Sequence, residues 1–557
     1  MNGAYLLIGV SACFLLGYRF FAKWIERKLG IDPSRPTPAV VKNDGCDYVP
    51  AHPTVLFGHH FAAIAGAGPI VGPVLAAEFG WVPVVCWILF GCIFIGAMHD
   101  MIALFLSVRH EGQSIGAVIG TILGKPGRIM ALLFSWSALI LLVAEFCRQI
   151  AGTFVVDPAI ATASLLFIGE AVLFGFCIYR WHMSVLVASL IFVPVMFAFV
   201  WVGNLIPLDL QALFGCSVET TRTIWTIVLI AYCFVASTCP VQFLLQPRDY
   251  LNAYLLYVMM ALGFLGVFVA HPVLHLDAFA GFSVVGRAGS SDLLFPFLFI
   301  TVACGACSGF HALVASGTSS KQVSNERSIR PIAYGGMLLE GVLATIGLIG
   351  VAGTYLSQKD YVSAIQGMEP VQMFASTIAG FCVKLFTSIG MDAEFGKHIA
   401  ESFMLLSVSA FLMTSVDAGT RLSRFSWQEL MPKKNPVLQN RFLATFFICV
   451  IVAALLLVNP QVAKQLWTLF GSANQLFASL TFLTATLWLI RNKRPGWITA
   501  IPMVFMFGVS TWGLSSIFIT AIRNGDFIRL FASTFLLLLA LMLIVIATLK
   551  GKKAVQE

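Results

Sequence analysis

The sequence predicts an all-α protein that crosses a membrane about fifteen times, with a LeuT-like core of two inverted five-helix repeats containing broken helices. Composition is the first observation behind this prediction. Of the 557 residues, 59% are hydrophobic and only 11% are charged, and the mean hydropathy is +0.90. Soluble domains contain about 25% charged residues, so the chain is not a soluble protein with one anchor. The second observation is a pair of apolar segments, five spans apart, that are both interrupted by helix-breaking residues.

Apolar stretches recur along the whole chain, and a spanning helix needs about 20 such residues. A further stretch, Val371–Ile389, is interrupted by Lys384, and we interpret it as a re-entrant or interfacial helix. No nucleotide-binding loop of the GxxxxGK(S/T) type occurs, so ATP is not the expected energy source. Fifteen spans are predicted, at residues 4–22, 55–78, 82–107, 128–150, 159–180, 183–206, 223–247, 250–271, 293–317, 332–356, 397–415, 441–458, 466–489, 498–521 and 528–549.

The basic residues predict how the chain is oriented. The net charge is +8, and most of the 34 Lys and Arg residues fall in alternate loops between the predicted spans. Loops rich in Lys and Arg stay on the cytoplasmic side. The sequence therefore predicts an N-terminus outside the cell and a cytoplasmic C-terminus.

The first interrupted segment, Phe57–Glu78, is apolar enough for a bilayer but carries two adjacent histidines. A lipid-facing helix cannot leave backbone groups unpaired, so such a break survives only inside protein or beside a water-filled cavity. Ionisable groups beside a broken membrane helix are typical of a transporter binding site; the alternative is a kink with two packed histidines. Adjacent helical residues point about 100° apart, and we favour the second histidine as the one facing the cavity. The candidate site residues here are His59, His60, Gly66, Gly68 and Pro69.

The second interruption is predicted in the span 223–247, where Pro240 lies among small polar residues. Gln242 is a further candidate for the substrate or ion site. Interrupted helices at corresponding positions of two halves indicate a five-plus-five transporter core. The predicted domains are a peripheral first helix and cytoplasmic loop at 1–54, repeats at 55–206 and 223–415, and peripheral C-terminal helices at 441–549.

Charged side chains at membrane depth are the next signal, because a carboxylate there costs about 2.5–3.5 kcal/mol unless it is paired. In the span 82–107, His99 and Asp100 form either a proton relay or a static polar pair. In the span 128–150, Glu145 and Arg148 are spaced i,i+3, which predicts a structural ion pair or a substrate gate.

The span 293–317 is the richest in polar residues after the first interrupted segment. Ser308 and the later hydroxyls of Ser316 and Thr318 could serve an ion or a substrate. Cys304, Cys307 and His311 fall at i, i+3 and i+7, on one face of a helix. With one of the two adjacent histidines, that face could hold a soft metal such as zinc. The alternative is that the cysteines are small apolar residues that let helices approach.

Further along, two polar pairs are predicted to have structural roles. Asp417 and Arg421 are spaced i,i+4 and are expected to pair at the cytoplasmic face. Asn474 and Gln475 lie in the span 466–489, where we expect them to form hydrogen bonds between helices.

These segments closely resemble the carbon starvation protein (CstA) family from Asn43 to about Leu476. The matching stretches are NDGCDYVP, LFGHHFAAIAGAGPIVGPVLAAE, QPRDYL, FPFLFITVACGACSGFHALVASGT, YGGMLLE, VDAGTR and LWTLFGSANQL. The resemblance implies a bacterial inner-membrane transporter with a five-plus-five fold, counted with the amino acid–polyamine–organocation superfamily. His99 and Cys307 depart from the family pattern. By motif match the resemblance carries over the break at Gly66, Gly68 and Pro69 and the site residues His59, His60, Asp100, Ser308, His311 and Glu340.

Two classes of function stay open at this point. The first is a secondary transporter, not an enzyme, that imports small peptides or a small carboxylate such as pyruvate, since the resemblance covers members linked to both. His60, Asp100 and His311 at membrane depth favour proton coupling, with no cofactor beyond the coupling ion; sodium is the alternative ion. The second class is a metal-binding membrane sensor or enzyme. The expected partners are a small-molecule substrate and the lipid bilayer, with no nucleic acid.

Overall fold

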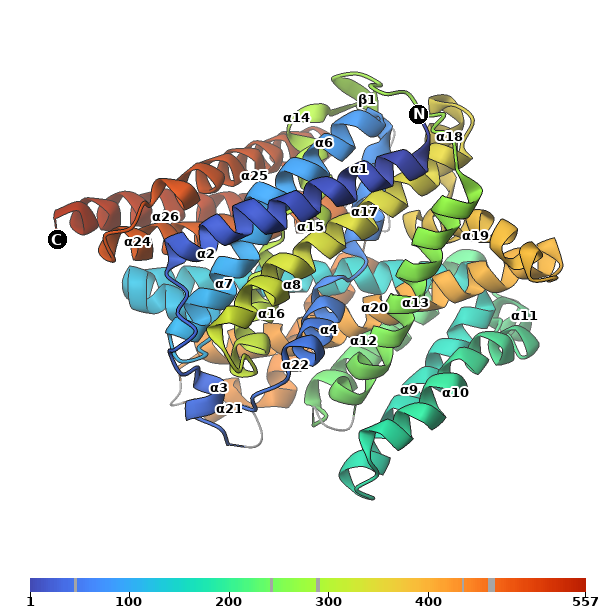
Figure 1. Ribbon diagram of the computed structural model, residues 1–557, viewed down its shortest axis with the longest axis horizontal. Coiled ribbons are helices and arrows are strands. Elements are labelled where there is room, and N and C mark those ends of the chain that lie inside the picture. The colour runs from blue at the N-terminus through green and yellow to red at the C-terminus, as the bar shows by residue number, and fades with distance from the viewer. Residues whose placement is uncertain (45–47, 241–243, 287–290, 433–434, 459–465, 557) are drawn as a thin grey trace.

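The computed structural model describes residues 1–44, 48–240, 244–286, 291–432, 435–458 and 466–556. Long helices make up most of the chain and pack into one bundle (Figure 1). The described part contains one antiparallel hairpin, in which β1 (Ser283–Val285) pairs with β2 (Ser291–Leu293). The predicted all-α membrane architecture is therefore confirmed.

The first predicted break is present. Helix α4 (Pro53–Ile64) ends at Ala65, whose ψ of 55° is not helical, and α5 (Gly68–Ala76) begins three residues later with Pro69 in its first turn. The two segments are bent by 46° relative to each other. Proline suits the first turn of a helix because its missing N–H would have no intrahelical partner there.

The second break lies elsewhere than predicted. Helix α12 (Val218–Thr238) is continuous, and Pro240 follows its end, where proline commonly stands because it cannot continue a helix. The interruption predicted inside the span 223–247 is thus wrong, and Gln242 lies outside the described residues. The second broken span is instead α14 (Leu294–Thr301), α15 (Ala303–Ala306) and α16 (Gly309–Gly317), in which Cys307 and Ser308 are extended.

The packing of helices around the two breaks follows a twofold pattern. Each of three helix contacts has a counterpart elsewhere in the bundle. The α5–α17 contact corresponds to α16–α7, the α8–α24 contact to α20–α13, and the α8–α12 contact to α20–α22. Two further contacts, α8–α20 and α12–α22, each join a helix to its own counterpart. We infer that α4–α5, α6–α7, α8, α12 and α13 form one repeat, and α14–α16, α17, α20, α22 and α24 the other. The bounds not yet given are α6 (Trp81–Phe90), α7 (Ala97–Arg109), α8 (Ile115–Val156), α13 (Leu245–Ala270), α17 (Gly335–Thr354), α20 (Ala393–Leu430), α22 (Arg441–Leu457) and α24 (Leu466–Arg491).

The remaining helices lie outside these ten positions. A hairpin of α9 and α10 follows α8 and projects from one side of the bundle, and α18 and α19 are inserted between α17 and α20 (Figure 1). The repeat limits predicted at 55–206 and 223–415 relied on the misplaced interruption, and they leave these insertions inside the repeats. These additional helices are α1 (Gly3–Leu16), α2 (Lys23–Leu29), α9 (Pro158–Tyr179), α10 (Val185–Leu205), α18 (Gln358–Gly367), α19 (Pro370–Ser388), α25 (Trp497–Asn524) and α26 (Phe527–Gln556).

The predicted count of fifteen spans is not confirmed. Among the described residues, 13 helices are long and apolar enough to cross a membrane, or up to 14 if the bent pair α4–α5 is one span. The count differs because α14–α16 is divided into short pieces and α22 has only 17 residues. In contrast, α19, predicted as a re-entrant or interfacial segment, meets the length and apolarity of a span.

Glycines bring the broken helices into direct backbone contact. A Cβ atom on Gly68 would lie 2.2 Å from Cys304 Cβ, and one on Gly72 would lie 2.7 Å from the carbonyl oxygen of Thr301. On the other side, a Cβ atom on Gly96 would lie 2.2 Å from the carbonyl oxygen of Ala306. Side chains cannot occupy these positions unless the backbone moves apart.

We therefore expect Gly96→Ala to lower the free energy of unfolding by about 1–3 kcal/mol, since extra atoms in a packed core force the backbone to shift. Thermal unfolding of the purified protein in detergent should show a lower Tm. Gly508→Ala in α25 is the matched control, because open space surrounds Gly508 and alanine favours a helix by up to about 1 kcal/mol. Equal Tm values for the two variants would contradict this account of the contact.

Candidate functional site

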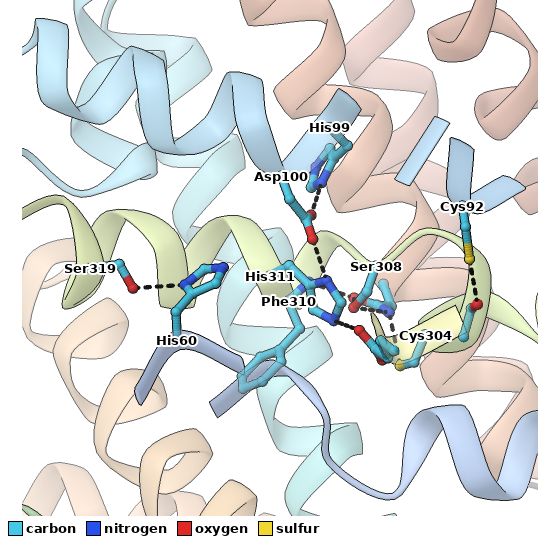
Figure 2. Close-up of polar contacts among 12 residues, drawn as sticks. His60, Cys92, His99, Asp100, Cys304, Ser308, Phe310, His311 and Ser319 are labelled. Atoms are coloured by element: carbon cyan, nitrogen blue, oxygen red, sulfur yellow. Dashed lines mark hydrogen bonds and ion pairs between the residues drawn. The ribbon is translucent and has the colours of Figure 1, made fainter. Parts of the chain in front are cut away.

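Three titratable side chains from three helices meet beside the second break. Asp100 is on α7, His311 is in the first turn of α16, and Glu340 is on α17. His311 Nδ1 lies 2.7 Å from Asp100 Oδ2, and His311 Nε2 lies 3.4 Å from Glu340 Oε2 (Figure 2). All three are fully buried. Three of the candidate residues, which come from separate predicted spans, thus lie together.

A second imidazole contacts the same carboxylate from its own helix. His99 Nδ1 lies 2.9 Å from Asp100 Oδ1, and the His99 side chain is fully buried (Figure 2). The predicted pairing of His99 with Asp100 is therefore present, and each oxygen of the carboxylate has one imidazole partner.

Of the two adjacent histidines on α4, His60 is the buried one. Its Nδ1 lies 2.7 Å from the hydroxyl of Ser319, which follows α16 (Figure 2). His59 is partly exposed and makes no hydrogen bond to this cluster among the described residues. The sequence favoured His60 as the histidine that faces the cavity, and this assignment stays a prediction. Ser319 belongs to the same hydroxyl-rich segment as the predicted candidates Ser316 and Thr318, but Ser319 itself was not predicted.

The N-terminus of α16 is capped by a side chain from another helix. Asn474 on α24 accepts a hydrogen bond from the backbone N–H of Phe310 (2.7 Å) and donates one to the Ser308 hydroxyl (3.0 Å). The amide also lies 3.6 Å from the sulfur of Cys304. The interhelical role expected for Asn474 is confirmed, but its place at the break could not be foreseen because the break itself was not predicted.

The predicted metal face does not form. Cys304 ends up on α15 and His311 on α16, because the chain is extended at Cys307 and Ser308. The spacing i, i+3, i+7 describes one face only in an unbroken helix. Within the described ranges, no group of three or more His, Cys, Asp or Glu side chains is placed to hold a metal ion. Cys304, Cys307 and His311 are therefore not a metal site by this geometry.

A cavity of about 580 Å³ opens between α8, α16, α20 and the loops near them. Ser316 lines this cavity, and its hydroxyl accepts a hydrogen bond from the N–H of Ile115 at 2.9 Å. Thr318 is exposed and donates to the carbonyl of Val314, so it lies apart from the central cluster. Tyr48 and Lys321 stand at the cavity, with the Lys321 ammonium 5.5 Å from the centre of the Tyr48 ring.

The cavity leads toward the second break. Leu313 and Phe477 line the large cavity and also a much smaller one, whose walls include Phe310 and Asn474. The two shared apolar side chains place the small cavity next to the large one. In the loop between α7 and α8, Glu111 accepts a hydrogen bond from Lys42 at 2.6 Å, which lowers the pKa of the Glu111 carboxyl.

At the other end of α8, Arg148 forms a buried ion-pair network. Its guanidinium contacts Glu145 Oε1 at 2.8 Å and Glu369 Oε1 at 3.1 Å. The predicted i,i+3 pair is confirmed, and the additional partner Glu369 immediately precedes α19. The network therefore ties the inserted α18–α19 segment to α8.

A second buried arginine, Arg248, pairs with Asp417 in place of the predicted partner Arg421. Arg248 on α13 is fully buried and contacts both Asp417 and Tyr232 at 2.6 Å. The predicted Asp417–Arg421 pair is wrong, because Arg421 instead donates to the carbonyls of Ala236 and Cys239 at the end of α12. Carbonyls at a helix C-terminus lack intrahelical partners and accept such donors. Sequence spacing could not reveal a partner that comes from another helix.

The sequence of this chain matches a known protein family. A family model described as Carbon starvation protein CstA matches residues 2–366 and 360–513. The chain is 32% identical to the peptide transporter CstA of Campylobacter jejuni, covering 92% of this chain and 80% of the relative. It is also 32% identical to the pyruvate/proton symporter BtsT of Escherichia coli, covering 92% and 81%.

Solved structures with a similar course of the chain include two transporters. MhsT in complex with L-phenylalanine has a TM-score of 0.47 at 14% identity, covering 88% of this chain and 99% of that chain. A variant of the Eremococcus coleocola manganese transporter has a TM-score of 0.41 at 10% identity, covering 90% and 95%.

The Arg248–Asp417 pair supplies a test of the buried network. We expect Asp417→Asn to lower the free energy of unfolding by about 3–5 kcal/mol, because a buried charge then loses its ionised partner. Glu429→Gln is the control, since its pair with Arg128 at 3.3 Å is partly exposed and such pairs contribute up to about 1 kcal/mol. Thermal unfolding with equal Tm losses for both variants would contradict a structural role of the buried pair.

Proposed function

Since the chain belongs to the carbon starvation protein CstA family, we propose that this membrane transporter imports small peptides or a small carboxylate such as pyruvate, driven by the proton gradient across the inner membrane. The observation that carries the proposal is the buried His311 imidazole between Asp100 and Glu340. These groups come from α7, α16 and α17, so the proton that they share connects both repeats. The site holds no cofactor in this proposal.

A proton can bias the conformation at this site because the site excludes water. Asp100, His311 and Glu340 together can carry a net charge that changes by one when a proton binds or leaves, and imidazole exchanges protons near neutral pH. Unpaired charge is costly inside a membrane. A conformation that pairs all charges in one protonation state therefore holds an unpaired charge in the other. Proton binding thus shifts the balance between conformations.

The position of the cavity, together with the predicted orientation, supports an inward-open state. Tyr48 and Lys321 at its mouth belong to loops that the basic-residue pattern assigns to the cytoplasm. With the N-terminus outside, this structure is then inward-facing. Arg148 and Glu369 lie at the other end of α8 and would form the outer closure, which supports a role as a gate as well as an ion pair.

A carboxylate is the chemical group that peptides and pyruvate share. The N-terminus of α16 offers backbone N–H groups and the positive end of a helix dipole to an anion. Ser308 and Asn474 lie at that terminus, and Phe310 and Asn474 line the small cavity beside it. This arrangement supports carboxylate binding at the break, with Gly66, Gly68 and Pro69 shaping the opposing half-helix.

Sodium is the alternative coupling ion, and its candidate ligands are the hydroxyls after the break. Ser316 and Ser320 donate to backbone carbonyls one turn earlier, and Ser319 is bonded to His60. Each hydroxyl oxygen keeps a lone pair that a cation could bind, so these hydrogen bonds do not distinguish proton from sodium coupling. Replacing external sodium with choline at a fixed pH gradient distinguishes the two, because only a sodium-coupled carrier stops. The sensor or enzyme alternative relied on the metal face, and no observation now favours it.

We expect His311→Gln and Asp100→Asn to reduce uptake driven by a pH gradient at least tenfold, which corresponds to about 1.4 kcal/mol in the rate-limiting barrier. The reason is that each variant removes a group that exchanges the coupling proton. Uptake of labelled pyruvate and of a labelled dipeptide into proteoliposomes measures the effect. His398→Gln, at an exposed position of α20, should transport normally. Normal gradient-driven uptake by both site variants would refute the proposed proton site.

Ligand binding should raise the thermal stability of the purified protein. A ligand that binds only the folded state adds about 2.7 kcal/mol at one hundred times its Kd. A thermal-shift screen of pyruvate, related acids, dipeptides and tripeptides then separates the two substrate classes. We expect one class to raise the Tm and Asn474→Ala to weaken that shift. A shift that is the same in Asn474→Ala would place the carboxylate elsewhere.

A further inference from the structure

The proposed function uses one of the two imidazoles that contact Asp100 and leaves the other without a role. His99 and His311 each approach a different oxygen of this carboxylate, at 2.9 and 2.7 Å through their Nδ1 atoms (Figure 2). His99 comes from the same helix as Asp100, whereas His311 comes from the broken helix. His99 is fully buried. The carboxylate thus lies between two groups of the same chemistry.

The tautomer of each imidazole follows from the carboxylate. An ionised carboxylate only accepts hydrogen bonds, so each Nδ1 must carry the hydrogen. A proton that binds or leaves must then act at Nε2 of either ring. His311 Nε2 faces Glu340 at 3.4 Å. His99 Nε2 has no hydrogen-bond partner among the described residues.

We propose that His99 is both the positioning residue for Asp100 and a second holder of the coupling proton. It keeps one carboxylate oxygen engaged so that the other faces His311. When a conformational change opens the site to water, a proton binds the lone pair of His99 Nε2, and the resulting imidazolium pairs with Asp100 through its Nδ1–H; the same proton returns to water when the site opens on the other side. The inference rests on the proposed proton coupling.

The contacts of His99 include an aromatic ring and a carboxylate. The ring of Phe482 on α24 lies 5.2 Å from the His99 ring, centre to centre, at an interplanar angle of 67°. Asp100, at hydrogen-bond distance, supplies the negative charge. Phe482 is the residue of α24 in the described contact with His99, and it carries no charge.

The other titratable groups near His99 come from the elements packed on α7. They are His311 and Cys307 around α16, Glu340 on α17 and Cys92 before α7. His60 on α4 does not contact Asp100 in the described hydrogen bonds; it is hydrogen-bonded to Ser319. Two cations in adjoining segments have other contacts: Arg330 pairs with Glu26, and Lys321 lies over Tyr48.

The test compares His99→Gln, which keeps a hydrogen-bond donor but cannot titrate, with His99→Leu, which loses both. Gradient-driven uptake of labelled pyruvate and of a labelled dipeptide is measured in proteoliposomes from about pH 5 to 9, the range in which histidine titrates. We expect His99→Gln to keep KM within about threefold, which is less than 1.4 kcal/mol, while the pH profile of the maximal rate shifts. His99→Leu should also raise KM. A His99→Gln profile that superimposes on the parent profile overturns the inference.

His110→Gln is the matched control, because His110 lies just after the end of α7 and contacts the carbonyl of Leu106; its pH profile should match the parent. A second readout does not depend on transport. Solid-state NMR of the full chain in lipid bilayers, labelled with 15N-histidine, should show one imidazole whose Nε2 becomes protonated as the pH falls and whose signal is missing in His99→Gln. A His99 signal that stays neutral over the whole range overturns the inference. Parent uptake that ignores the pH gradient would instead refute the proposed function, whatever the NMR result.

Discussion

Two helix breaks that meet inside a membrane bundle are the constraint on which the rest of this structure depends. Backbone groups freed near Gly66 and at Cys307–Ser308 find no water in the bilayer core, so protein must surround them. Helices α17, α20 and α24 enclose them and are among the most buried spans, whereas α10 is largely exposed. Glycines at the contacts let backbone approach backbone. The twofold packing of long helices is therefore the means by which two locally unfavourable segments become stable.

The buried charges divide into two kinds with different consequences. Arg148 with its carboxylates and Arg248 with Asp417 link α8 to the segment before α19 and α13 to α20. Arginine keeps its charge in proteins, so these pairs do not respond to a proton. The set of Asp100, His311 and Glu340 contains only groups that can gain or lose one. A cluster that senses the proton gradient must contain groups that gain or lose a proton, which selects this third cluster. The two arginine pairs keep their charges.

The sequence predicted the membrane-embedded fold, and it pointed to candidate site residues because charge in an apolar span is a strong signal. Two such candidates, Asp100 and His311, lie together in the structure with Glu340, which the family resemblance supplied. The second break was misplaced because proline was taken as its marker; Pro240 ends a helix, while the actual break at Cys307–Ser308 contains no proline. Partners that come from distant helices, such as Glu369 for Arg148, leave no trace in local spacing. The predictions that failed, the second break at Pro240 and the Asp417–Arg421 pair, thus depend on packing between helices.

The substrate question can be reduced to one part of the site. The related peptide transporter and the related pyruvate/proton symporter match this chain equally well, at 32% identity over 92% of its length. Overall similarity therefore does not separate the two substrates. A helix N-terminus recognises the carboxylate that both share, so Ser308 and Asn474 would not separate them either. What differs is the rest of the ligand, and Leu313 and Phe477 line both the large cavity and the small one beside the capped terminus. In the proposed site we therefore expect selectivity to depend on how far these two side chains separate, because only a peptide needs room for side chains there.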